Sequence, residues 1–320
     1  MIQLLRHHEI DPLRWEACLQ KAHEPLVYVH AWYLETVCAG NWEALVEKQD
    51  EEYVSVFPLP VRTLLGQKKV YQPLFAQQLG LVVTPASQHR TVEEYLALLP
   101  PLFSQVQYQL PWPNFVPAAL PQSWQGRLRP NYELPLFSTY AALRQQYSTN
   151  LRRNLQKAQK AQLVIEPAAS ISALLALFRQ TKGLELPDLK PRHYAILEKL
   201  YRRAKEEKVG EIWEVRVQQE VVAAAFVLRT AHRVTFLFGA SSALGRQVGA
   251  MAFLLDSLVQ QEAMTGKTFD FEGSEVSGVA KFYAGFGALP VSYVSLGVKS
   301  KPSALQWIPN VFISLAKRLR

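Results

Sequence analysis

The sequence has few of the features that mark secreted, membrane or metal proteins. Its 320 residues include only two cysteines, Cys18 and Cys38, too few for a disulfide framework, and we expect both to be small buried residues. No histidine and cysteine spacing suggests a metal site. No apolar run approaches the roughly 20 residues of a bilayer-spanning helix, and the first ten residues carry charges where a signal peptide is apolar. We therefore expect a cytoplasmic protein without a bound metal.

Two common catalytic signatures are also missing. The tripeptide GKT at 266–268 would belong to a P-loop only if a glycine stood five positions before Gly266, and Gln261 is there. The sequence has no G-x-S-x-G elbow of the kind that serves serine hydrolysis. Neither P-loop nucleotide chemistry nor that form of serine chemistry is predicted.

The composition is that of a globular protein with an anionic partner. Apolar residues make up 49% and charged residues 19% of the chain. A length of 320 residues favours two domains or one duplicated unit. The net charge of +8 and the pI of about 9.4 indicate nucleic acid, a phosphorylated small molecule or the inner membrane surface as the partner.

The positive charge gathers in two segments. Residues 150–162 predict an amphipathic helix, because Leu151, Leu155 and Ala158 recur at spacings of four and three on one side of it. The other side carries the cations. This cationic face either binds an anion or is a solvated surface. Residues 301–320 predict a second basic amphipathic helix, which would attach to an anionic membrane surface or merely complement the helix dipole. The cations of the first helix are Arg152, Arg153, Lys157 and Lys160.

The stretch from Thr268 to Leu289 carries the pattern of a reaction site. Side chains alternate along a strand, so Asp270 and Glu272 would share one face while Phe269 and Phe271 share the other. Two carboxylates in line at the end of a buried strand are candidates for acid and base chemistry. Alternatively, they cap the following helix or pair with nearby cations.

Two lobes follow from the order of predicted elements. The first has helices at 11–22 and 30–38, strands between 42 and 83, a helix at 91–106 and a strand at 106–110, followed by proline-rich loops. A basic helical segment at 139–162 leads into the second lobe. There we predict the order β, α, α, β, β, β, α, β, α, β, in which helices cover a mixed sheet.

This order resembles the N-acetyltransferase (GNAT) domain. In that family the helix after the fourth strand carries R/Q-x-x-G-x-G/A, and this sequence has RQVGAM from Arg246 to Met251. YSTNLRRNLQKAQKAQLVIE before the second lobe and FDFEGSEVSGVAKFYAGFGA near its end resemble more closely the Fem-like branch, related to the aminoacyltransferases that build peptidoglycan bridges. The resemblance implies an α/β fold of two tandem GNAT-like lobes, at 1–138 and 163–300, joined by a bridging helix at 139–162.

The resemblance also implies a donor site. The amides at the helix start would hold the pyrophosphate of acetyl-coenzyme A or another acyl-coenzyme A, with aminoacyl-tRNA as the less favoured donor. Gly249 would allow a close approach, whereas Met251 stands where the signature has a small residue. Alternatively, the glycines only start a packed helix. The predicted cofactor-binding residues are Arg246, Val248, Gly249 and Ala250.

Acyl transfer to an amine needs a base, a polarised carbonyl and an acid for the leaving group. Glu272 is the predicted base, and Asp270 is expected to orient the site or the substrate amine. In similar GNAT enzymes a tyrosine before the GF element protonates the leaving thiolate, but Lys281 stands at that place and Tyr283 two residues beyond. Lys281 would bind a phosphate or carboxylate, or is an exposed helix lysine.

Two functions are therefore carried forward. The first is an acyltransferase that moves an acyl or aminoacyl group from a thioester or aminoacyl donor onto an amine, such as that of a cell-wall or other anionic precursor. Arg152, Arg153 and Lys157 would hold an anionic part of donor or acceptor. The second is a catalytically silent GNAT-like scaffold whose basic helices bind RNA or an anionic membrane surface. Acidic residues that face an open cleft would favour the first, and sealed ones the second.

Overall fold

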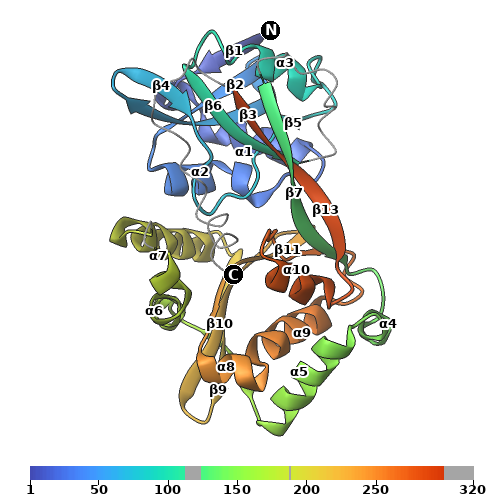
Figure 1. The fold of residues 1–320 in the computed structure, drawn as a ribbon. Helices are drawn as coiled ribbons and strands as arrows, with labels where there is room; N and C mark the ends of the chain where they lie inside the picture. Colours follow the sequence, from blue (N-terminus) through green and yellow to red (C-terminus); the bar gives the residue numbers. More distant parts are fainter. Residues whose placement is uncertain (112–123, 187–188, 299–320) are drawn as a thin grey trace. The chain divides into compact units, whose positions relative to one another are not determined.

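The structure is a computed structural model that describes residues 1–111, 124–186 and 189–298 (Figure 1). Of these, Met1–Arg129 and residues 292–298 form one compact unit, unit 1, and Pro130–Val291 form another, unit 2. The helical segment predicted as a bridge at 139–162 lies inside unit 2, and the end of the predicted second lobe lies with unit 1. The helix predicted at 301–320 lies outside the described residues. No described helix is both long and apolar enough to cross a bilayer.

Unit 1 is built on a mostly antiparallel sheet with the strand order β1-β2-β3-β4-β6-β13-β7, in which β4 and β6 run parallel and β5 pairs with β3. Its helices are α1 (Pro12–Lys21), α2 (Ala31–Cys38), α3 (Val92–Ala97) and the short 3-10 turns η1 (His7–Glu9) and η2 (Val27–Val29). Its strands are β1 (Ile2–Leu5), β2 (Trp42–Gln49), β3 (Glu52–Leu64), β4 (Gln67–Val70), β5 (Val82–Val83), β6 (Gln105–Pro111) and parts of β7 (Trp124–Pro135) and β13 (Leu289–Val298).

Large aromatic side chains form the core of unit 1. Phe57 of β3 stacks on Tyr108 of β6 with ring centroids 4.8 Å apart. Trp15 of α1 is fully buried, and its indole N–H donates to the carbonyl of Val29 over 2.9 Å. Both cysteines are buried here, as predicted, and burial raises the pKa of each thiol to about 12. They act as small apolar residues of the core.

Unit 2 has the strand order β7-β12-β11-β10-β9-β8, in which β11 and β12 run parallel and the other neighbours antiparallel. Its strands are β8 (Val164–Ala168), β9 (Gly210–Val217), β10 (Glu220–Arg229), β11 (Arg233–Ser241) and β12 (Thr268–Asp270), with the remainder of β7 and β13. Its helices are α4 (Tyr140–Gln145), α5 (Thr149–Lys160), α6 (Ser172–Gln180), η5 (Lys182–Glu185), α7 (Pro191–Glu206), α8 (Ala243–Val248), α9 (Ala250–Glu262) and α10 (Ser277–Ala284).

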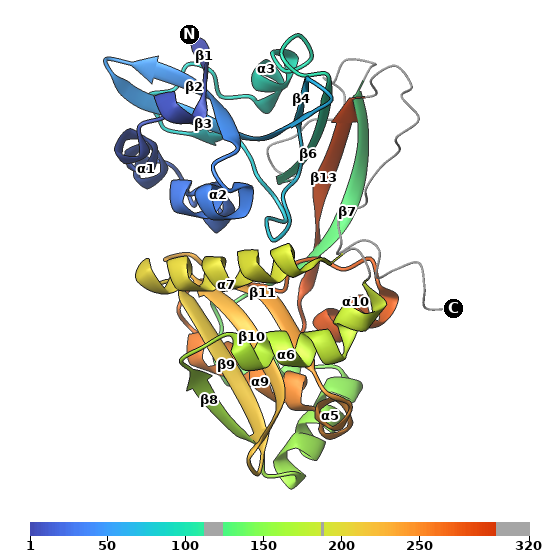
Figure 2. The ribbon, with the colours of Figure 1, turned by 90° about the vertical axis from the view of Figure 1, so that its left-hand side faces the viewer.

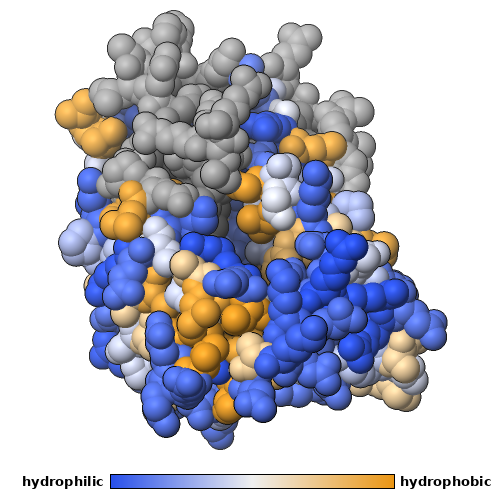
Figure 3. All heavy atoms as spheres, turned by 60° about the horizontal axis from the view of Figure 1, so that its bottom comes forward, coloured by the Kyte–Doolittle hydropathy of each residue, from blue (hydrophilic) through white to orange (hydrophobic). Residues whose placement is uncertain are grey.

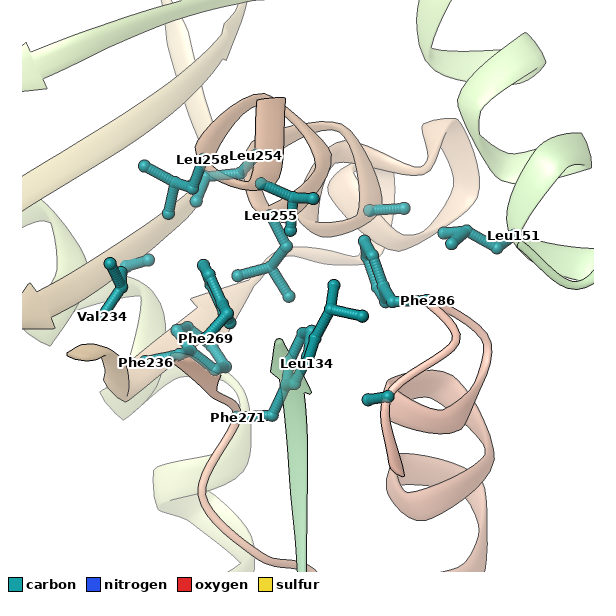
Figure 4. Close-up of a cluster of buried hydrophobic side chains, with 14 of the residues drawn as sticks. Leu134, Leu151, Val234, Phe236, Leu254, Leu255, Leu258, Phe269, Phe271 and Phe286 are labelled. Atoms are coloured by element: carbon teal, nitrogen blue, oxygen red, sulfur yellow. The ribbon is translucent and has the colours of Figure 1, made fainter. Parts of the chain in front are cut away.

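Helices cover both faces of the sheet in unit 2. On one face α6 and α7 contact β9, β10 and β11 (Figure 2). There Tyr201 of α7 packs edge-on against Phe226 of β10. On the other face α9 packs against β9, β10 and β11. Leu255 of α9, Phe269 of β12 and Phe286 after α10 meet there in one apolar cluster (Figure 4). This layered mixed sheet confirms the predicted α/β class.

The predicted elements from residue 130 onward are largely confirmed, with three differences. The basic helical segment is two helices, α4 and α5, because the chain turns at residues 146–148 and Ser148 caps α5. The helix opened by glycines is broken at Gly249 into α8 and α9. Pro130, expected in a loop, lies within β7, before the residues that pair with β12 and at the division between the units.

Candidate active site

The site is built around the end of β12, where the strand stops at Asp270 and the chain turns sharply. Glu272 adopts a left-handed backbone with φ of 52°, unusual for a residue with a side chain. Its backbone N–H donates to the carboxylate of Asp270 over 2.9 Å. Gly273 follows with no room for a side chain, because an added Cβ would lie 1.9 Å from the carbonyl of Pro130. The turn at Glu272 is thus fixed by the hydrogen bond to Asp270 before it and by the close packing of Gly273 against β7 after it.

Asp270 is sealed into a polar network on the face opposite the apolar cluster. Its side chain is 1% exposed and accepts hydrogen bonds from Asn131 and Arg233, each over 3.0 Å. Arg233 also bonds Glu133 over 2.6 Å. The pKa of Glu133 is raised, mainly by burial and next by the negative charge of Asp270. The positive charge of Arg233 acts in the opposite direction but does not cancel the rise. With all these partners, Asp270 positions the backbone of Glu272 and does not face an open cleft.

The predicted alternation along this strand is therefore only partly realised. Phe269 and Phe271 do share the apolar face, with ring centroids 4.7 Å apart (Figure 4). Asp270 points to the other face, but the left-handed turn at Glu272 ends the alternation. Glu272 is 8% exposed, so both carboxylates lie largely beneath other side chains.

The phenol of Tyr283 lies near these two carboxylates. Its ring stacks on Phe271 with centroids 5.1 Å apart and contacts Phe236 edge-on at 6.4 Å. Burial raises the pKa of Tyr283, and the negative charges of Glu272 and Asp270 raise it further. The phenol stays protonated at neutral pH, as an acid that protonates a leaving group must. Lys281, two residues earlier on α10, points to solvent.

The turn of α8 before Gly249 is capped by residues of the chain itself. Ser242 caps α8, so the amides of Gly245 and Arg246 donate to its hydroxyl and carbonyl, each over 3.0 Å. The amide of Gly249 donates to the carbonyl of Arg246. The Arg246 side chain turns back to the carbonyl of Ser241 over 2.9 Å. The amides of Gly245, Arg246 and Gly249 thus have acceptors within the chain, whereas α9 begins at Ala250 without a side-chain cap.

The space beside Gly249 is occupied by α5. Gly249 is buried with φ of 76°, and an added Cβ would lie 2.4 Å from the carbonyl oxygen of Asn154. Met251 extends toward Gly239 of β11, where its terminal methyl would lie 3.2 Å from an added Cβ. Gly249 therefore allows the close approach of α5 to the start of α9. The binding of a coenzyme A pyrophosphate at this segment stays a prediction.

The cationic face of α5 forms as predicted. Leu151, Leu155 and Ala158 are buried against α9, and the charged side chains point outward. Arg152 donates to the carbonyl of Gln145 over 2.7 Å. In the part of the chain that the structure describes, no carboxylate pairs with the exposed cations Arg152, Arg153, Lys157 and Lys160.

The sequence did not reveal the partners of Asp270, since Asn131 and Glu133 lie well over a hundred residues earlier in the chain. A second missed cluster centres on Asp256 of α9, which accepts hydrogen bonds from Tyr147 over 2.8 Å and from Tyr140 over 2.9 Å. The sequence contained one signal for this second cluster. A single acid in the apolar run AMAFLLDSLV must find hydrogen-bond donors when that helix is buried.

Residues 145–275 match the family model described as the acetyltransferase (GNAT) domain, and this part of the chain has the GNAT fold. The chain has the tandem, Fem-like form of this fold, as its resemblance implied. It is similar to the crystal structure of FemX, with 12% identity, a TM-score of 0.62, and coverage of 91% of this chain and 96% of that one.

Two further solved structures have the same fold. L-PGS from Bacillus licheniformis is 11% identical, with a TM-score of 0.55 over 92% of this chain and 93% of that one. A tandem GNAT protein from the clavulanic acid biosynthesis pathway is 9% identical, with a TM-score of 0.51 over 95% of this chain and 100% of that one. At such identities the likeness is one of fold. No curated protein matches the chain.

Proposed function

We propose that the chain transfers an acyl or aminoacyl group to an amine, with Glu272 as the base. The observation that carries the proposal is the position of Glu272, which lies in a turn at the end of β12 and whose charge acts on Tyr283. The residue lies within the stretch that matches the GNAT domain.

In this proposal the amine nitrogen attacks the acyl carbon, and the bond from that carbon to the leaving sulfur or oxygen breaks. Glu272 accepts the proton of the amine, and Tyr283 gives its proton to the leaving group. Asp270 positions Glu272 through the backbone hydrogen bond. Lys281 would bind a phosphate or carboxylate of a substrate, because it is exposed on α10.

The cations of α5 and the glycine signature indicate where the donor and the acceptor would bind. Arg152, Arg153 and Lys157 would hold an anionic portion of either substrate, such as a cell-wall precursor that the Fem-like resemblance implies. An acyl-coenzyme A would bind at the start of α9, where the helix has no side-chain cap. Acetyl-coenzyme A and aminoacyl-tRNA are therefore both donors to be tested.

The test is turnover of the full chain with acyl-coenzyme A and aminoacyl-tRNA donors and a panel of amines. Glu272→Gln should lower kcat about 10²- to 10⁴-fold, the range for loss of a general base. Glu275→Gln is the matched control, a half-buried acid three residues further on, and should change kcat little. An unchanged kcat in Glu272→Gln would assign the proton transfer to another group. Calorimetric titration with acetyl-coenzyme A tests the donor separately.

A second candidate is a catalytically silent GNAT scaffold that binds an anionic partner through α5. The burial of both carboxylates favours it. It predicts no turnover with any donor, together with binding of RNA or anionic vesicles that Glu272→Gln leaves intact.

A further inference from the structure

One end of unit 2 carries an apolar surface next to the cations of α5. This end holds α5, α8 and the turn between β9 and β10, and its surface shows an apolar patch bordered by dense hydrophilic side chains (Figures 1 and 3). Leu244 of α8 is 36% exposed, and the other members are half-buried. We name this set the apolar tip; its residues are Leu163, Ile165, Val217, Leu244 and Val248.

The chain itself brings the apolar tip and the cations together. The last turn of α5 ends at Lys160, and residues 161–163 lead directly into β8. Ile165 of β8 pairs with Val215 of β9, so Val217 lies at the same end of the sheet. α8 packs on the first residues of β10, where the amide of Ser242 donates to the carbonyl of Val222 over 2.9 Å.

The cations of α5 form a stripe along the helix. Arg153, Lys157 and Lys160 are spaced by four and three residues, so they share one side. Among the described residues none of them pairs with a carboxylate. By contrast, Arg216 on the neighbouring strand bonds Glu166 over 2.6 Å and Glu214 over 2.7 Å. The charge of the stripe is therefore available to a partner.

We propose that this surface docks on an anionic lipid bilayer, whether or not the chain is catalytic. A bilayer attracts the cations through its headgroups and buries the apolar side chains at the interface, so both halves of the surface are used. A second copy of the chain would bring like charges together. RNA would engage the cations but would not bury the leucine and valine side chains.

The test is flotation of the full chain with vesicles of phosphatidylcholine alone and of phosphatidylcholine with phosphatidylglycerol. The chain should bind the anionic vesicles at least about tenfold more tightly, and added salt should weaken binding. Lys157→Glu with Lys160→Glu should lower binding at least about tenfold. Leu244→Gln with Val217→Thr, which keeps the charge, should also lower it several-fold.

A control variant separates the surface from overall charge. Lys199→Glu with Arg202→Glu on α7 makes the same change in net charge at exposed positions and should retain binding. Equal loss in this control, or no difference between the two vesicles, overturns the proposal. So does full binding by Leu244→Gln with Val217→Thr, particularly if RNA competes for the lysines. Because flotation needs no turnover, its failure would leave the proposed transfer reaction untouched.

Discussion

The carbonyl oxygen of Asn154 lies against Gly249, 2.4 Å from the point where a Cβ on that glycine would be. Gly249→Ala should therefore destabilise unit 2 for two reasons. A left-handed alanine costs about 1 to 2 kcal/mol, and the clash with the α5 backbone adds about 1 to 3 kcal/mol. Thermal or urea unfolding of the variant measures the sum.

Gly266→Ala is the matched control for this substitution. Gly266 has nearly the same φ, 75°, but its nearest neighbour is a ring carbon of Phe137 at an ordinary 3.5 Å. The control should show the backbone cost alone. If the two variants lost equal stability, α5 would not pack against Gly249 as described.

Tyr147→Phe should destabilise the chain in a pH-dependent way. Burial raises the pKa of Asp256, and hydrogen bonds from Tyr147 and Tyr140 oppose that rise. A raised folded-state pKa means that stability falls as the pH rises from the ordinary carboxylate range through the raised pKa. Without the Tyr147 hydroxyl the ionised form loses a donor, at a cost of about 1.5 to 3 kcal/mol.

This cost should shrink as the pH falls and Asp256 becomes protonated in both proteins. Urea unfolding across the acid to neutral range gives the profile. Tyr140→Phe serves as the comparison and should cost less, because Tyr140 is partly exposed and water can replace its hydroxyl. A Tyr147→Phe loss that is constant with pH would show that it comes from packing.

Ser87→Ala should show the opposite dependence for Glu47 in unit 1. Burial alone would raise the pKa of Glu47, but hydrogen bonds from Ser87 over 2.6 Å and from two backbone amides outweigh it and lower the pKa. A lowered pKa contributes stability above the ordinary carboxylate range, and this is lost as the pH falls through the folded-state value.

The Ser87→Ala variant should lose about 1 to 2 kcal/mol at neutral pH and progressively less in acid. Ser104→Ala is the control, since the exposed Ser104 donates to the carbonyl of Lys68 over 3.1 Å and touches no carboxylate. Chemical denaturation at several pH values distinguishes the two. A greater loss in acid than at neutral pH would contradict the assigned role of Glu47.

The local pattern of the sequence predicted much of unit 2. The spacing of Leu151, Leu155 and Ala158 gave the buried side of α5, and Phe269 and Phe271 gave the apolar face of β12. These succeed because a helix or strand repeats over a few residues, so neighbours in sequence decide which side is buried. The GNAT-like order of elements followed from the same local patterns.

The site itself depended on contacts that no local pattern contains. Arg233 joins Asp270 to Glu133 across three adjacent strands, and their spacing along the chain gives no hint of it. The left-handed turn at Glu272 depends on the carboxylate of Asp270 and the close approach of β7. Likewise, Gly249 in the sequence does not say whether a phosphate or a helix backbone will lie against it.

The strand β13 begins in unit 2 and ends in unit 1, where residues 293–298 pair with β6. During synthesis, therefore, β6 lacks its partner β13, which is translated nearly two hundred residues later. Unit 1 is the first to leave the ribosome, yet it cannot complete its sheet until unit 2 has been translated. Until then the uncovered edge of β6 is a place where a nascent chain could join the wrong strand.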